Sequence, residues 1–153
     1  MDQYPLEDLV AWQLAVDLKD RIAHLMASTP AGRNFEFSGQ VYEASESMAS
    51  NISEGHGRYN PAEYANFLRY SRASIKELIE RLPDGVRRRY YQPSDIHEIM
   101  KLLHREARVV GGRRDSMIRL AKKRKEEQKR RRRPAGKKRP AHPAAPRKGN
   151  LPT

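Results

Sequence analysis

The side chains with the clearest chemical potential in this sequence are Lys and Arg residues gathered near its C-terminus. Four arginines stand in a row at positions 130–133, with further Lys and Arg on both sides. Each phosphate that such cations neutralise releases condensed counterions, so we expect this stretch to bind nucleic acid regardless of base sequence. The predicted phosphate-binding residues are Lys122, Lys123, Arg124, Lys125, Lys129, Arg130, Arg131, Arg132, Arg133, Lys137, Lys138 and Arg139.

Two other interpretations of this basic stretch stay open. It can serve only to keep the protein soluble, because net charge supports non-specific association and carries no specificity. It can also approach an anionic membrane surface, but the stretch has no Trp, Phe or amphipathic face that would insert. We therefore favour nucleic acid as the partner and expect no membrane contact.

A second basic cluster lies further upstream, where a turn between two helices is expected. It consists of Arg87, Arg88, Arg89 and Tyr90, followed by Tyr91. Guanidinium and aromatic planes can stack on unpaired bases. The alternative is that the tyrosines pack against the end of a helical bundle while the arginines are solvated.

The search for a catalytic or metal centre gives negative results. Bundles can hold metal ions through Glu-x-x-His pairs, but no histidine here has a glutamate three residues before it. His97 and His104 share a helix face, yet the residue between them at one-turn spacing is Lys101, a poor ligand. Gly55-His56-Gly57 lacks the third glycine of a dinucleotide loop and follows a helix, and no Ser-x-x-Lys or Gly-x-Ser-x-Gly element is present. We expect no enzyme, no metal and no cofactor.

The distribution of charge divides the 153-residue chain, whose net charge is +12. Residues 1–121 hold 17 basic and 17 acidic side chains, whereas residues 122–153 hold 14 basic and two acidic. Half of the ten prolines also lie beyond residue 133. Such a segment buries too little apolar surface to offset its ordering entropy. We expect a bundle domain at residues 1–121 and a basic tail at 122–153, helical at its start and disordered from about Arg130.

The composition also bears on the compartment. The sequence has no Cys, which fits a reducing environment. No apolar run approaches the ~18 residues that span a bilayer. The acidic, polar start differs from a secretory signal, which begins with Lys or Arg and then turns apolar. We expect a cytoplasmic protein.

Apolar residues recur at helical spacing throughout residues 1–121, and no alternating strand pattern stands out. The first helix is expected at about 6–28, with an apolar arc wider than one bundle core needs, so part of it should meet another subunit. The second is expected at about 38–54 and ends at Gly55 and Gly57, since glycine readily adopts the left-handed conformation of a helix stop. Its predicted buried residues are Val41, Ala44, Ser45, Met48 and Ile52.

Two further helices complete the predicted fold. The third opens with the capping box Asn60-Pro61-Ala62-Glu63, and we expect Pro83-Asp84-Gly85 to break it. Ser94 is expected to cap the fourth, with Gly111-Gly112 as a weak point. The predicted buried residues are Tyr64, Leu68, Ser71, Ile75, Leu78 and Leu82, then Ile96, Met100, Leu103, Ala107, Val110, Arg114, Met117 and Ala121. Four helices with short connections predict an all-α, antiparallel up-down four-helix bundle.

Several of these residues also carry a family resemblance. They are Trp12-Gln13 with Ala15, the string Asn51-Ile52-Ser53-Glu54-Gly55-His56-Gly57-Arg58, Phe67-Leu68, and Ser74 with Glu77-Leu78. This pattern resembles the four-helix bundle proteins encoded in intervening sequences of 23S rRNA genes, a family that is similar to the accessory protein of diversity-generating retroelements. The resemblance covers about residues 6–121. It implies a ring-shaped homopentamer that binds nucleic acid, contact with a reverse transcriptase in the retroelement branch, and no catalytic residues.

The sequence departs from the family pattern where that pattern is basic. Family members tend to have basic residues after the glutamine of the second helix, whereas here Gln40-Val41 is followed by Tyr42-Glu43. We therefore expect the tail to supply most of the nucleic-acid affinity. We assign a mainly structural role to Trp12, Asn51, Glu54, Gly55, Gly57 and Arg58. Asn51 and Glu54 can bond backbone donors or Arg58. The alternative is that the string forms a partner-binding loop.

Two classes of function fit these observations. The first is a non-catalytic nucleic-acid-binding accessory protein, an oligomer whose basic tails contact RNA or DNA. The second is a protein-interaction scaffold for a reverse transcriptase, a ribosomal component or another ribonucleoprotein.

Overall fold

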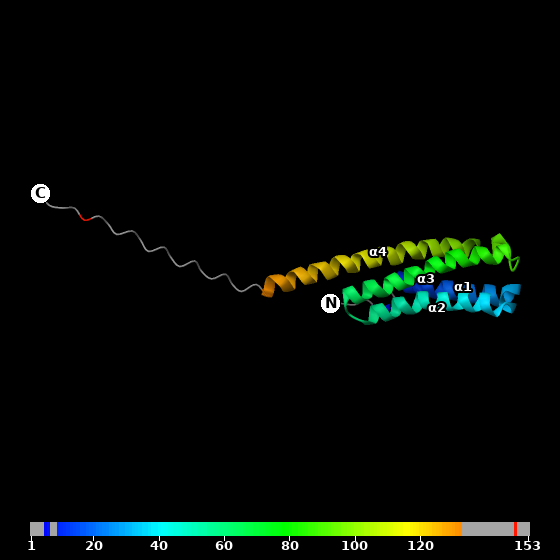
Figure 1. The fold of residues 1–153 in the computed structure, drawn as a ribbon, viewed down its shortest axis with the longest axis horizontal. Coiled ribbons are helices and arrows are strands. Elements are labelled where there is room, and N and C mark those ends of the chain that lie inside the picture. The colour runs from blue at the N-terminus through cyan, green and yellow to red at the C-terminus, as the bar shows by residue number, and fades with distance from the viewer. Residues whose placement is uncertain (1–4, 7–8, 133–148, 150–153) are drawn as a thin grey trace.

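The computed structural model describes residues 5–6, 9–132 and 149, and within these ranges it is an all-α protein with no β-strand. Four α-helices follow one another: α1 (Val10–Ser28), α2 (Phe35–Gly57), α3 (Pro61–Arg87) and α4 (Pro93–Arg132). A short 3₁₀ helix, η2 (Pro30–Arg33), lies between α1 and α2. Figure 1 shows the four helices lying side by side along one long axis. The predicted all-α fold with four helices is confirmed.

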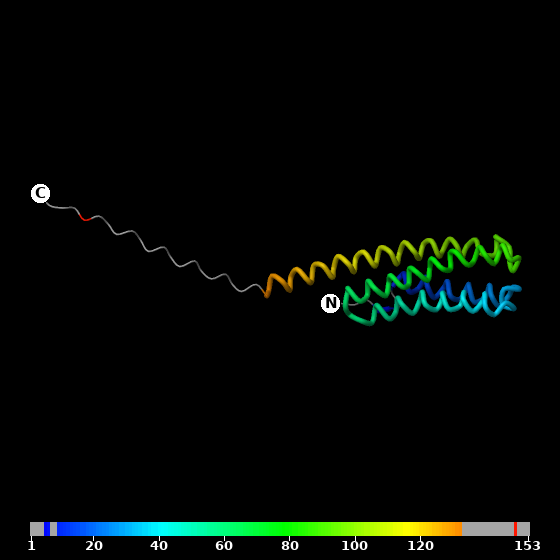
Figure 2. Tube along the Cα trace, in the orientation of Figure 1, coloured from blue at the N-terminus to red at the C-terminus, as the bar shows by residue number. Residues whose placement is uncertain are grey.

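Contacts between distant parts of the chain show how the helices pack. Ser71 of α3 donates a hydrogen bond from Oγ to the backbone carbonyl of Met48 on α2, at 2.8 Å. Arg81, late in α3, reaches Gln40, early in α2. The end of α1 likewise lies next to the start of α4, because residues of both line one cavity. Neighbouring helices therefore run in opposite directions, and α2 and α4 stand on a diagonal of the bundle because α1 and α3 separate them (Figure 2).

The apolar core lies between the four helices and takes side chains from each. Every residue predicted to be buried on α2 and α3 is buried: Val41, Ala44, Ser45, Met48 and Ile52, then Tyr64, Leu68, Ser71, Ile75, Leu78 and Leu82. The buried residues of α1 are Ala11, Leu14, Ala15, Leu18, Ile22, Leu25 and Met26. Trp12 is half-buried against this core. One chain alone therefore covers much of the apolar arc of α1.

On α4 the predicted spacing is right at some positions and wrong at others. Ile96, Leu103 and Val110 are buried as expected, whereas the remaining predicted positions, Met100, Ala107, Arg114, Met117 and Ala121, are half-buried. Two further positions, Ile99 and Glu106, are buried and do not follow from the predicted pattern. A glutamate at a core position breaks the apolar periodicity on which the prediction rests.

Glu106 is a buried acid in the middle of α4. Its side chain is 0% exposed, and neither carboxyl oxygen has a hydrogen-bond partner. Burial disfavours the charged form and raises the pKa of Glu106 to about 8, while the charge of Arg105 opposes this rise. The carboxyl group is therefore protonated at neutral pH.

Asparagines cap the start of two helices. Asn60 accepts hydrogen bonds through Oδ1 from the backbone N–H groups of Ala62 and Glu63, at 2.9 and 3.3 Å, and Pro61 occupies the first helical position. The predicted cap of α3 is thus confirmed. Asn34 caps α2 by accepting from the N–H of Phe37, at 3.0 Å. Both caps satisfy N–H groups that a helix start leaves without a partner.

The helix α2 does end at Gly57, but the predicted left-handed glycine stop is wrong. Gly55 and Gly57 are helical, and no described glycine has a positive φ. The left-handed residue is Tyr59, with φ of 55°. A Cβ atom at Gly55 would lie 2.7 Å from Cβ of Phe67 and 2.6 Å from a ring carbon of Tyr64. Gly55 is therefore needed for the close approach of α2 and α3, not for a turn.

The predicted break at Pro83 is also wrong, because α3 continues through Pro83 as far as Arg87. Tyr91 explains this continuation: its ring lies against Gly85, where a Cβ atom would collide with it, and its hydroxyl donates to the carbonyl of Leu82 at 2.7 Å. The reversal comes later, at Arg89, with φ of 61°. A tertiary contact thus holds the last turn of α3 in place.

The start of α4 differs from the prediction as well. The helix begins at Pro93, and the Asp95 carboxylate accepts from the backbone N–H of Gln92 at 2.7 Å. Ser94 is therefore inside the helix and is not its cap. At the first helix, the observed start is Val10 rather than the expected residue 6.

The helix α4 is the longest element, with 40 residues. It passes through Gly111 and Gly112 and continues beyond the end of the bundle, where its orange end projects alone in Figure 2. The expected disorder from Arg130 is wrong for Arg130, Arg131 and Arg132, which are helical. The rest of the predicted disordered tail lies outside the described residues. The predicted border between residues 121 and 122 falls inside this continuous helix.

Candidate nucleic-acid interface

The projecting end of α4, residues 122–132, forms a basic helical surface that we call the α4 extension. Its cations are Lys122, Lys123, Arg124, Lys125, Lys129, Arg130, Arg131 and Arg132, all exposed except the half-buried Arg124. Eleven helical residues span about 16 Å, so these cations are concentrated on a short rod. The other four predicted phosphate-binding residues, Arg133, Lys137, Lys138 and Arg139, lie outside the described residues.

The acidic residues of the α4 extension stand at spacings that favour a helix. Glu126 lies four residues after Lys122 and four before Arg130, and Glu127 repeats this pattern one position later. Opposite charges at this spacing face each other on a helix, and each pair stabilises it by about 0.2–0.5 kcal/mol. We therefore expect charge pairing to support the helical form of the extension.

A second basic surface lies on the bundle itself, in a groove between α3 and α4. Arg69, Arg72 and Lys76 of α3 and Arg114 of α4 line a cavity of about 480 Å³ that has no acidic residue in its lining. The apolar part of the lining is Ala73, Ile75, Ile79 and Ala107. Lys76 also pairs with Glu80 outside the lining, at 3.8 Å. With no carboxylate in the lining itself, the four cations still make this α3–α4 groove attractive to phosphate.

The α3–α4 groove and the α4 extension share one face of α4. Lys125 and Arg132 follow Arg114 by 11 and 18 residues, which is about three and five whole turns at 3.6 residues per turn. The face that carries Arg114 into the groove therefore continues along the extension. Sequence reasoning missed the groove, although Arg69, Arg72 and Lys76 have the 3,4 spacing of one helix face.

The second predicted cluster lies at the opposite end of the bundle, at the α3–α4 turn. Tyr91 is buried, and the Tyr90 ring packs edge-on against Phe37 with centroids 5.1 Å apart. The Tyr90 hydroxyl also accepts from Nδ2 of Asn34, at 2.7 Å. Both tyrosines are thus engaged within the bundle, in the arrangement of the second interpretation above.

The arginines of this cluster are exposed, and two of them share one acid. Arg88 and Arg87 contact the Asp84 carboxylate at 2.7 and 3.2 Å. The hydrogen bond from Arg88 lowers the pKa of Asp84, and burial opposes this shift. Arg88 also lies over the Phe37 ring, at 5.7 Å from its centroid. This neutralisation makes the turn a weaker anion site than the α3–α4 groove.

The string at residues 51–58 closes the end of α2. Glu54 and Arg58 form an ion pair at 2.5 Å, as the structural assignment allows. Asn51 instead donates through Nδ2 to the backbone carbonyl of Ser47, at 2.7 Å. The buried His56 ring lies 6.0 Å from that of Tyr64, centroid to centroid. Gly57, in contrast to Gly55, has open space around it.

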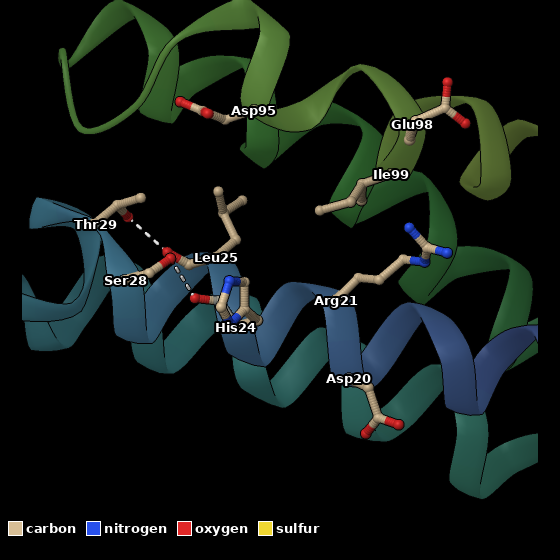
Figure 3. Close-up of a pocket in the computed structure, with 9 residues that line it drawn as sticks. All are labelled: Asp20, Arg21, His24, Leu25, Ser28, Thr29, Asp95, Glu98 and Ile99. Carbon is tan, nitrogen blue, oxygen red and sulfur yellow. Dashed lines mark hydrogen bonds between the residues drawn. The ribbon is translucent and has the colours of Figure 1, made fainter.

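A third surface, between the end of α1 and the start of α4, has the opposite charge. Asp20, Asp95 and Glu98 line a cavity of about 460 Å³ together with one arginine, Arg21, which forms an ion pair with Asp17. Figure 3 shows Asp20 and Arg21 pointing in different directions, while Ser28 and Thr29 donate to backbone carbonyls of their own helix. The carboxylates do not converge, and this surface repels phosphate.

No group of three or more His, Cys, Asp or Glu residues that could hold a metal ion occurs within the described residues. His97 and His104, weighed above as ligands, are exposed. Within the same part of the chain no helix is long and apolar enough to cross a membrane.

Comparison with known proteins complements this geometry. No curated protein matches the chain. A family model described as 23S rRNA-intervening sequence protein matches residues 7–112, which comprise α1, α2, α3 and the first half of α4. The matched region contains the string at residues 51–58 and ends before the α4 extension. The chain therefore belongs to the 23S rRNA-intervening sequence protein family.

Proposed function

We propose that this protein is a non-catalytic accessory protein that binds RNA or DNA through phosphate contacts. The observation that carries the proposal is the α4 extension, a helix with eight Lys and Arg and two Glu that projects from the bundle. The α3–α4 groove adds Arg114 on the same face of α4, together with three cations from α3. Phosphate contacts carry no base information, so little sequence preference is expected.

The distribution of charge over the helices favours one side of the bundle for nucleic-acid binding. On α2 the four charged residues are all acidic, whereas α4 has fourteen basic and six acidic residues. These two helices stand on a diagonal of the bundle. A polyanion is therefore attracted to the edge formed by α4 and the neighbouring face of α3, and repelled from α2.

The test is a salt titration of duplex binding by the full chain and by a chain ending at Ala121. If about six phosphates are neutralised, the log–log slope of affinity against salt is near −5 for the full chain. The shortened chain should lose most of the affinity and most of the slope, since only the groove remains. Binding by a chain ending at Arg132 measures the contribution of the α4 extension without the residues that follow it.

An unchanged affinity and slope in the chain ending at Ala121 would make residues 122–153 a solubilising tail. The bundle would then be the binding surface, and the α3–α4 groove its best candidate. Substituting Arg72 and Lys76 by Gln tests the groove separately, because both are exposed and line it.

The proposal includes a homopentamer and a cytoplasmic location. The family resemblance supports the pentamer, and the exposed Val10 on α1 leaves apolar surface for a second copy. Five copies would present five α4 extensions to one nucleic acid and raise avidity without new contacts. The absence of Cys supports a reducing compartment.

The alternative function is a scaffold that binds a reverse transcriptase or another ribonucleoprotein, as the resemblance to the retroelement accessory protein implies. One observation favours it: Phe35 is 86% exposed and lines a cavity of about 440 Å³ with Met26, Pro30 and Tyr42. Phe35→Ser should abolish binding to such a partner and leave nucleic-acid binding intact. A reverse transcriptase gene next to the gene for this protein would favour the alternative, and an insertion in an rRNA gene would favour the first proposal.

A further inference from the structure

We propose that aromatic and arginine side chains at the surface of the α2–α3 end of the bundle form a stacking site for unpaired bases of single-stranded nucleic acid. The side chains are Arg58, Phe67, Tyr70 and Arg69, which we call the aromatic–arginine row. This inference rests on the proposed nucleic-acid binding. It adds the form of nucleic acid that the protein prefers.

The row is a continuous series of contacts between flat, delocalised groups. The Arg58 guanidinium carbon lies 5.4 Å from the Phe67 ring centroid. The Phe67 and Tyr70 rings meet edge-on with centroids 6.4 Å apart, and the Arg69 guanidinium carbon lies 4.7 Å from the Tyr70 centroid. Unpaired bases stack on aromatic rings and on guanidinium planes alike.

A ligand can reach the row through the Tyr70 ring, whereas the Phe67 ring is half-buried. Tyr70 is 49% exposed, and Tyr59, in the connection next to Arg58, is 77% exposed. Large aromatic side chains usually gain contacts by burial, yet about half of the Tyr70 surface and most of the Tyr59 surface stay open to solvent. An exposed aromatic surface flanked by cations fits a base attached to a phosphate.

The family string builds the row. The ion pair between Glu54 and Arg58 holds the arginine next to the Phe67 ring. Gly55 leaves the space that Cβ of Phe67 needs against α2. Residues that the sequence assigns mainly to structure therefore also position two members of the row.

The row lies near both proposed phosphate-binding surfaces. Arg69 belongs to the row and also lines the α3–α4 groove. Arg113 of α4 lies over the ring of Tyr64 in the first turns of α3, at 5.7 Å, and α4 then continues into its extension past this end of the bundle (Figure 2). A strand held by its phosphates on the α4 extension can thus present bases to the row.

The test compares the full chain and its variants on a fluorescent oligouridine and on a duplex of the same length, at several salt concentrations. Tyr70→Ala should weaken single-strand binding about ten-fold, within the range known for loss of one stacking contact. Duplex affinity and the salt slope should stay unchanged. Tyr70→Phe should bind normally because it keeps the ring, whereas Arg69→Lys should lose single-strand affinity because it keeps only the charge.

Tyr42→Ala is the matched control, since Tyr42 is an exposed tyrosine of α2 that lines a different cavity. The inference would be overturned if Tyr70→Ala and Tyr42→Ala weakened single-strand binding equally. It would also be overturned if Tyr70→Ala lowered the affinity for single strand and duplex by the same factor. A changed oligomer mass in Tyr70→Ala with normal binding would assign the row to a contact between copies. If the full chain binds duplex but Tyr70→Ala keeps single-strand affinity, only this inference fails. If the full chain binds neither oligonucleotide, the proposed function fails with it.

Discussion

Gly55 lies where α2 and α3 approach each other, and its role there is steric. The neighbouring atoms belong to the Tyr64 ring and to Cβ of Phe67, which is fixed to the backbone of α3. A methyl group in this space would push the two helices apart or displace the Tyr64 ring. Gly57, two residues later in the same helix, has no neighbour within 4 Å and serves as a natural comparison.

We predict that Gly55→Ala destabilises the protein by about 1–3 kcal/mol through overpacking. Gly57→Ala should stabilise it by up to about 1 kcal/mol, because Ala is the better helix former and meets no atom. Urea denaturation of both variants measures the difference. Equal stability of the two variants would show that the space at Gly55 is not required.

Glu106 gives the protein an unusual dependence of stability on pH. Its pKa is raised from an ordinary value of 4.5 to about 8 in the folded protein. Between these values the unfolded chain loses the proton while the folded chain keeps it. The contribution of Glu106 to the free energy of unfolding is therefore fully present below pH 4.5. It decreases by about 1.4 kcal/mol per pH unit as the pH rises from 4.5 to about 8.

We predict that Glu106→Met removes this decrease and stabilises the protein at pH 7.5. The Met side chain fills a similar volume and places no unpaired carboxyl in the core. Melting temperatures at several values between pH 5 and 8 measure the effect, with Glu98→Met, at an exposed position of the same helix, as control. The same pH dependence in wild type and Glu106→Met would contradict the prediction.

At the scale of the helices, the sequence predicts the buried faces better than the ends. The 3,4 spacing of apolar residues identifies the core positions of α2 and α3 because burial repeats with the helix turn. The ends depend on contacts that the local sequence does not contain. Pro83 stays inside α3 because the Tyr91 ring packs on Gly85 and its hydroxyl binds the Leu82 carbonyl.

The candidate site is likewise predictable from the sequence only in part. The basic character of the α4 extension can be read directly from the sequence, because its cations are consecutive. The α3–α4 groove cannot, since its four cations come from two helices that also contain acidic residues. Only the packing of α3 against α4 brings Arg72 and Arg114 into one lining. The aromatic–arginine row likewise joins Arg58 of one segment to residues of α3.

The α4 extension should lose helicity when its two acidic residues are replaced. We predict that Glu126→Gln with Glu127→Gln lowers the helix signal in circular dichroism at low salt, because four favourable i,i+4 pairs are lost and the cations then repel one another. High salt should diminish the difference between variant and wild type. The exposed pair Glu80→Gln with Asp115→Gln, outside the extension, is the control. An unchanged helix signal would show that the extension needs no charge pairing.

At the scale of the whole molecule, the opposite charges of α2 and α4 bear on assembly. An acidic helix on one side and a basic helix on the diagonal allow copies to meet with complementary charge, in addition to the apolar side chains that remain exposed. Such a contact joins two different surfaces, and repeated contacts of this type close into a ring when the rotation permits.

We therefore predict that the full chain forms an oligomer, with five copies as the expected number from the family resemblance. Light scattering coupled to size exclusion measures the mass, and a chain ending at Ala121 shows whether the bundle alone assembles. Val10→Ser should weaken the assembly, because Val10 is half exposed on α1. A monomeric mass at micromolar concentration for both chains would contradict the prediction.

Because α4 leaves the bundle and continues into solvent, its inner and outer parts should differ in local unfolding. One continuous helix contains a part held by the core up to about Met117 and a part that projects beyond the core. Isolated helical segments open and close in about a microsecond, whereas buried helices exchange their amide hydrogens only through much larger openings. Amide protection should therefore fall along α4 without any break in its geometry. Bound phosphate would slow exchange in the outer part alone, so hydrogen exchange along this helix reports occupancy of the α4 extension directly.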